Sequence, residues 1–79
     1  MTGSLKEEGL KTIKEILNKH GITFTMSANI LANQFLETGN YSTRSMALFL
    51  NKAFDLVNNE LAEELSENLI SIIKAEAGN

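Results

Sequence analysis

The chain contains no cysteine and only one histidine, His20. Without cysteine it has no disulfide, no thiolate metal ligand and no thiol nucleophile. A lone imidazole also leaves no second histidine for a histidine-based zinc site. We therefore expect no bound metal, and no motif in the sequence indicates another cofactor.

The sequence also lacks a long hydrophobic run. The longest apolar stretch, residues 46–50, is far shorter than the roughly 20 residues that a membrane-spanning helix needs. The residues after Met1 are polar and acidic, unlike the basic and then apolar layout of a signal peptide. These features predict a cytoplasmic protein with no membrane partner.

Motifs that support catalysis are missing as well. The sequence has no glycine-rich phosphate loop, no nucleophile elbow and no carboxylate at a useful spacing from His20. The glutamates near the C-terminus recur at helical positions, a pattern typical of a solvated helix face rather than of a general acid and base. We therefore do not expect an enzyme.

What is present fits one small domain. The chain has 79 residues, of which 43% are apolar. A chain of this size buries only about 60% of its unfolded surface, so such domains often gain stability from a partner chain. The net charge of −3 is unevenly placed, because residues 59–79 hold five glutamates and one lysine while the rest is nearly neutral. The acidity therefore belongs to the C-terminal segment.

The first segment predicts an amphipathic helix over residues 5–19. Its apolar residues follow helical spacing: Leu10, Ile13, Ile16 and Leu17. Gly21 provides a left-handed C-cap, and His20 lies at the helix C-terminus, where the helix dipole favours a cation.

The next residues change to an alternating pattern, which predicts a strand over residues 22–26. Its apolar residues would face one side, and Thr23 and Thr25 the other. A single strand leaves its backbone groups unpaired, so we expect it to pair antiparallel with the same strand of a second copy. The alternative is that residues 22–26 form an extended linker between two helices.

Two helices are predicted in the centre of the chain. The first starts at Ser27 or Asn29 and ends near Thr38, before Gly39. Its apolar side would comprise Ile30, Leu31 and Phe35.

The second central helix starts at Ser42 or Ser45. Its main apolar stripe consists of Met46, Phe49, Leu50, Ala53, Phe54 and Val57. Because Leu48 and Leu56 lie off this stripe, we expect the helix to contact a neighbouring subunit as well as its own.

The C-terminal segment predicts a last helix after Asn58 and Asn59. Its apolar face consists of Leu61, Leu65, Leu69, Ile72 and Ile73. Because no glycine or proline interrupts residues 43–77, one continuous helix is the alternative. The apolar face either completes the core of this chain or docks in a groove of a protein partner such as a toxin.

Three stretches of sequence carry a resemblance. Residues 22–27 form the alternating run, and residues 51–54 lie within the second central helix. Between them, the pattern E-[ST]-G-x-Y-x-x-x-S is formed by Glu37, Thr38, Gly39, Tyr41 and Ser45. Together these stretches resemble the ribbon-helix-helix (CopG/Arc/ParD-like) family of dimeric DNA-binding proteins, and the pattern is similar to the inter-helix turn of ParD-type antitoxins.

The resemblance implies a mainly helical fold with one short strand, in which two copies intertwine through a two-stranded antiparallel ribbon. Residues 22–58 would form this ribbon-helix-helix core. Residues 1–21 would add an N-terminal helix and residues 59–79 an acidic C-terminal helix, all in one structural domain. The core of the dimer would comprise Ile22, Phe24, Met26, Phe49, Leu50 and Phe54.

The same resemblance implies a sequence-specific transcriptional regulator, a repressor or antitoxin-like autoregulator, whose ribbon lies in the major groove of double-stranded DNA. Thr23 and Thr25 would contact base edges, with Lys19 and His20 as additional DNA contacts. A phosphate would be held at the start of the second central helix by Ser42, Thr43, Arg44 and Ser45. The alternative is a small acidic helical protein-interaction module, an inhibitor or adaptor, without DNA binding.

Overall fold

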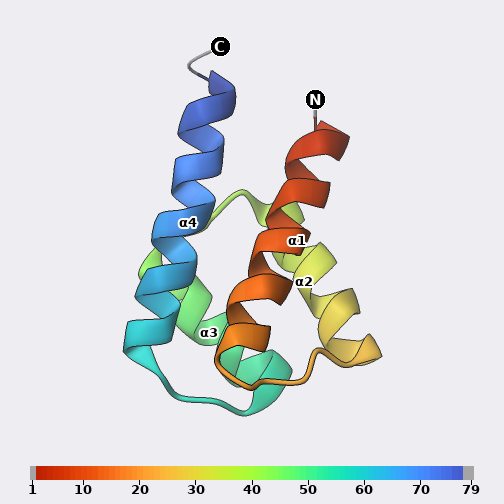
Figure 1. The fold of residues 1–79 in the computed structure, drawn as a ribbon, viewed down its shortest axis with the longest axis vertical. Helices are drawn as coiled ribbons and strands as arrows, with labels where there is room; N and C mark the ends of the chain where they lie inside the picture. Colours follow the sequence, from red (N-terminus) through yellow and green to blue (C-terminus); the bar gives the residue numbers. More distant parts are fainter. Residues whose placement is uncertain (1, 78–79) are drawn as a thin grey trace.

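The computed structural model describes residues 2–77, which contain four helices and no strand (Figure 1). The helices are α1 (Thr2–Lys19), α2 (Met26–Thr38), α3 (Thr43–Phe54) and α4 (Asn59–Ala77). Each helix contacts its two neighbours in the order α1, α2, α3, α4 and back to α1. Successive helices run in opposite directions, so the free ends of α1 and α4 lie at the same end of the molecule (Figure 1). The described chain is an antiparallel four-helix bundle.

The predicted ribbon-helix-helix core with its intermolecular strand is wrong, because residues 22–25 form an extended connector within the described chain. The predicted alternation of burial is present, since Ile22 and Phe24 are half-buried while the threonines between and after them are exposed. Met26, assigned to the same buried side, is instead the first residue of α2 and is 82% exposed. The alternative interpretation, an extended linker between two helices, is therefore confirmed.

Two helix caps explain why this segment is so short. Gly21, with φ of 76°, ends α1 in a Schellman motif, in which the Ile22 N–H donates to the carbonyl of Leu17 at 2.9 Å. Thr25 then begins α2, because its hydroxyl accepts from the Ala28 N–H at 3.1 Å. Too little chain remains between the two caps to build a sheet.

The other helix boundaries follow the sequence closely. α1 covers the predicted helix, and α2 ends at Gly39 with φ of 74°. Ser42, one of the two predicted residues, caps α3. α3 ends at Phe54, before the predicted Val57, because Asp55 takes a left-handed conformation with φ of 54°. α3 and α4 are thus separate helices rather than one continuous helix.

The core receives apolar side chains from all four helices. Its buried members are Ile13, Ile16, Leu17, Ala32, Leu36, Tyr41, Met46, Phe49, Leu50, Leu61, Ala62, Leu65 and Leu69. The C-terminal apolar face therefore packs into the core of this chain through its first three leucines, whereas Ile72 and Ile73 are half-buried.

All the aromatic residues of the chain, four phenylalanines and one tyrosine, form a single row. The ring centroids are 5.5 Å apart for Tyr41 and Phe35, 5.1 Å for Phe35 and Phe49, 6.0 Å for Phe49 and Phe54, and 5.8 Å for Phe54 and Phe24. These separations are typical of attractive ring contacts. The row joins α2 to α3 and also holds the connector between α1 and α2 against α3.

α2 turns a different side to the core from the one predicted. Its buried residues are Ala28, Ala32 and Leu36, whereas Leu31 and Phe35 are half-buried and Ile30 is 54% exposed. Helix α1 approaches this side closely, because a Cβ added at Gly9 would lie 2.9 Å from a methyl carbon of Leu36. The larger apolar side chains of α2 therefore face α3 and solvent.

Tyr41 fixes the loop between α2 and α3 by two hydrogen bonds. Its hydroxyl donates to the carbonyl of Leu36, and its own carbonyl accepts from the Ser66 hydroxyl of α4 at 2.6 Å. Burial raises the pKa of Tyr41, so the hydroxyl stays protonated as a donor near neutral pH. The turn that resembles the antitoxin motif thus has a structural role here, in which Gly39 ends α2 and Tyr41 anchors the loop.

We predict that Tyr41→Phe lowers the free energy of unfolding by about 1 kcal/mol, because the ring packing is kept while the Leu36 carbonyl loses its donor. Ser66→Ala removes the other bond and should cost a similar amount. Urea unfolding monitored by circular dichroism measures both. An unchanged unfolding midpoint in Tyr41→Phe would contradict the assigned role.

Candidate functional site

The two threonines predicted to read bases lie in the connector between α1 and α2. Thr23 is exposed beside a hollow of about 480 Å³, whose lining includes Lys14 and Phe24. The Lys14 ammonium lies 5.5 Å from the centre of the Phe24 ring. The Thr25 hydroxyl is already used to cap α2. The two side chains therefore do not share the face of a ribbon.

The predicted phosphate site lies at the start of α3, and its four residues are brought together there: Ser42, Thr43, Arg44 and Ser45. The Ser42 hydroxyl accepts from the Ser45 N–H at 3.3 Å and lies 3.2 Å from the Ser45 hydroxyl. The cap therefore already occupies one of the backbone donors that a phosphate would need. The Thr43 and Arg44 side chains are exposed.

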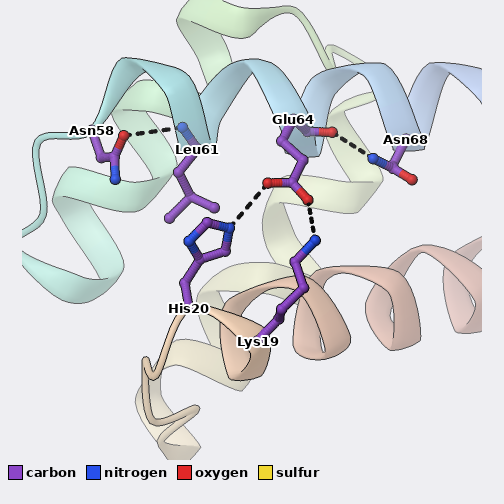
Figure 2. Close-up of polar contacts among 6 residues, drawn as sticks. All are labelled: Lys19, His20, Asn58, Leu61, Glu64 and Asn68. Atoms are coloured by element: carbon purple, nitrogen blue, oxygen red, sulfur yellow. Dashed lines mark hydrogen bonds and ion pairs between the residues drawn. The ribbon is translucent and has the colours of Figure 1, made fainter.

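Lys19 and His20, predicted as additional DNA contacts, both bind one carboxylate of α4 (Figure 2). Glu64 places one oxygen 2.7 Å from Lys19 Nζ and the other 3.0 Å from His20 Nε2. Hydrogen bonds from Lys19 and then His20 lower the pKa of the Glu64 carboxyl below its ordinary value of 4.5. Both side chains are therefore engaged in holding the end of α1 against α4.

A second ion pair holds α1 against α2. Lys6 Nζ lies 2.8 Å from a carboxylate oxygen of Glu37, and this hydrogen bond lowers the pKa of Glu37. Among residues 5–77, no ion pair crosses from α2 to α3. The contact between α2 and α3 therefore depends on apolar side chains, chiefly the aromatic row.

An apolar groove lies between α2 and α3. It has a volume of about 380 Å³ and is lined from α2 by Leu31, Gln34, Phe35 and Thr38, from the loop by Asn40, and from α3 by Ser45, Leu48, Phe49 and Lys52. Phe35 and Phe49, stacked in the aromatic row, contribute their rings to this lining. Polar side chains accompany the apolar ones, an arrangement typical of surfaces that bind a partner.

The groove includes a large apolar side chain that is exposed, Leu48 of α3, which is 65% exposed. On α2, outside the lining of the groove, Ile30 is 54% exposed and Met26 is exposed as well. α2 also carries no charged residue before Glu37. A helix surface that is both uncharged and apolar is unusual in contact with water and marks a candidate interaction surface. We name the surface formed by the residues that line the groove the α2–α3 groove.

A partial signal for this site is present in the sequence. Leu48 lies off the main stripe of its helix and predicted a second contact surface there. Leu31 and Phe35 belong to the predicted apolar side of α2, and in the structure they line the groove instead of the buried side. Five of the residues predicted to form a dimer core pack within a single chain instead. Phe49 and Leu50 are buried, and Ile22, Phe24 and Phe54 are half-buried.

Residues 2–77 contain no group of three or more histidine, aspartate or glutamate side chains placed to hold a metal ion. None of the helices α1 to α4 combines the length and hydropathy needed to span a membrane.

Comparisons with protein-family models, with curated proteins and with solved structures found no match to this chain.

We predict that the ion pairs of Glu64 make the fold less stable in acid. A carboxyl whose pKa is lowered by folding stabilises the fold above its unfolded pKa, and this contribution is lost as pH falls through the lower folded pKa. Glu64→Gln should lower stability at pH 7 by less than about 1 kcal/mol, since the pairs are near the surface.

Urea unfolding at pH 7 and at pH 3 measures this effect. The matched control is Glu63→Gln, which removes an exposed glutamate with no ion pair among the described residues. The stability difference between wild type and Glu64→Gln should shrink toward zero at pH 3. A difference of the same size at both pH values would show that the charge of Glu64 does not contribute.

Proposed function

We propose that this chain is a small helical protein-interaction module that binds an amphipathic helix of another protein in the α2–α3 groove. The observation that supports this most is Leu48, a large apolar side chain that is 65% exposed at the edge of a groove lined by Leu31, Phe35 and Phe49. Such a helix lays its apolar side into a groove through residues spaced about one turn apart.

The bundle is well suited to hold such a groove open. Ion pairs tie α1 to both α4 and α2, and Ser66 of α4 hydrogen-bonds the loop before α3. Stacked rings fix the distance between α2 and α3 at the groove itself. Binding would then require little reorganisation of the groove, which lowers the conformational-entropy cost of binding.

DNA binding stays a prediction with less support than before. The ribbon on which DNA binding depended is an extended connector, and two of the side chains predicted to contact DNA, Lys19 and His20, are bound to Glu64. The net charge of −3 also disfavours a polyanionic partner. Of the residues assigned to DNA, Arg44 is an exposed cation with no ion pair in residues 5–77.

We predict that helical peptides selected from a displayed random library will bind the α2–α3 groove. Chemical-shift mapping on the ¹⁵N-labelled protein should place the largest changes in α2 and α3. Leu48→Gln, which removes the exposed apolar side chain without adding a charge, should weaken binding about tenfold or more, as expected for a central apolar contact.

The matched control is Ile70→Gln, which removes an exposed apolar side chain of α4 away from the groove and should leave binding unchanged. Peptide-induced shifts confined to α1 and α4, or equal binding by both variants, would contradict the proposal.

A DNA titration distinguishes the other hypothesis. We expect no binding of a random-sequence duplex at physiological salt by fluorescence anisotropy. If binding is seen, and Arg44→Ala weakens it across all sequences and lowers the slope of log affinity against log salt by about 1, Arg44 contacts a phosphate and the DNA-binding hypothesis regains support.

A further inference from the structure

We infer that the helix bound in the α2–α3 groove is acidic and places two carboxylates, about two turns apart, against Arg44 and Lys52 of α3. This inference rests on the proposed function and adds the chemistry of the partner to it.

The two cations, Arg44 and Lys52, are both placed on α3. Arg44, Leu48 and Lys52 are separated by four residues each, so they lie on one side of α3 at successive turns. Eight residues of helix span about 12 Å, which sets the spacing of the two positive charges along α3. Lys52 lines the groove, whereas Arg44 lies outside the lining, one turn before the lining residue Leu48, and both cations are exposed.

Both cations also lack an internal partner. Within residues 5–77, ion pairs engage Lys6 and Lys19 but neither Arg44 nor Lys52. Two charges left free on either side of an exposed leucine are available to an incoming side chain.

No carboxylate lines the groove, and Asp55, which caps α3 three residues after Lys52, forms no ion pair among residues 5–77. Residues 26–54 contain a single acidic residue, Glu37, and this carboxylate is bound to Lys6 of α1. The remaining polar lining of the groove is neutral, consisting of Gln34, Thr38, Asn40 and Ser45. Lys52 is thus the one charged residue among those that line the groove, and together with Arg44 on the same helix it gives this side of α3 a positive charge that complements an acidic helix, within a chain whose net charge is −3.

Other occupants fit less well. Anionic membranes attract clusters of about four to eight basic residues, whereas this surface has two and the chain as a whole is negative. A second copy would offer its acidic helix α4, but the apolar residues Leu61, Leu65 and Leu69 of that helix are buried in its own core. A helix from another protein is the occupant that satisfies both the apolar lining and the two cations.

Three synthetic peptides test the inference. Each has 15 residues, leucines at i, i+3 and i+7 on one side, and two flanking positions seven residues apart that are both glutamate, both glutamine or both lysine. At low salt the glutamate peptide should bind about tenfold more tightly than the glutamine peptide, and the lysine peptide should bind most weakly. The preference should shrink at high salt, which screens exposed charges.

Charge reversal on the protein locates the effect. Arg44→Glu with Lys52→Glu should reverse the preference, so that the lysine peptide binds best. The matched control is Lys11→Glu with Lys74→Glu, which changes the net charge equally at two exposed lysines without an ion pair among the described residues. This control should leave the order of the peptides unchanged. If the reversed variant does not fold, Arg44→Gln with Lys52→Gln should abolish the preference instead.

The outcomes separate the two proposals. Equal affinity of all three peptides for the groove would overturn the inference and leave the proposed function standing. Failure of all three peptides, and of the selected ones, to bind the groove would overturn the proposed function itself.

The other occupants are tested directly. Sedimentation of the chain alone should show a monomer, and vesicles containing phosphatidylglycerol should not retain it. A dimer that Leu48→Gln dissociates would assign the groove to a second copy. Vesicle binding that Arg44→Glu with Lys52→Glu removes would assign it to a membrane surface, and either result would overturn the inference.

Discussion

The row of aromatic rings between α2 and α3 is the contact on which the rest of the structure depends. It uses every aromatic residue of the chain, and it joins two helices that no ion pair links among residues 5–77. Through Phe54 and Phe24 it also holds the connector between α1 and α2 against α3. The same stacked rings, Phe35 and Phe49, line the groove, so one set of contacts stabilises the fold and forms the candidate site.

The other helix contacts allow this arrangement. Lys6 and Glu37 close the surface between α1 and α2, and the cluster around Glu64 closes the surface between α1 and α4. Ser66 ties α4 to the loop that leads into α3. Polar contacts thus link those three pairs of neighbours, whereas the surface between α2 and α3 has an apolar groove and, among residues 5–77, two cations without an ion pair. The charged residues are also unevenly distributed between the helices. The acidic residues are gathered in α4, whereas Lys52 of α3 lines the groove.

Much of the helical structure could be predicted from the sequence, because caps and apolar periodicity are local signals. The Ser42 cap of α3 and the end of α2 at Gly39 are both of this kind. The strand was predicted wrongly because alternation reports which side chains are buried and not whether the backbone has a hydrogen-bonding partner. Residues 22–25 alternate correctly but lie between two caps. The side of α2 differs from the predicted one because Ala28, Ala32 and Leu36 form its buried side, with Leu36 close to Gly9 of α1. The larger side chains Leu31 and Phe35 then line the groove.

Intermolecular nuclear Overhauser effects are the measurement that shows whether a helix binds in the α2–α3 groove, as we propose. With the methyl groups of the protein labelled and a selected helical peptide bound, we expect cross-peaks from Leu31 and Leu48 to the leucine side chains of the peptide. Cross-peaks from Ile70 and Ile73 of α4 to the peptide, with none from Leu31 and Leu48, would place the partner elsewhere on the bundle and contradict the account.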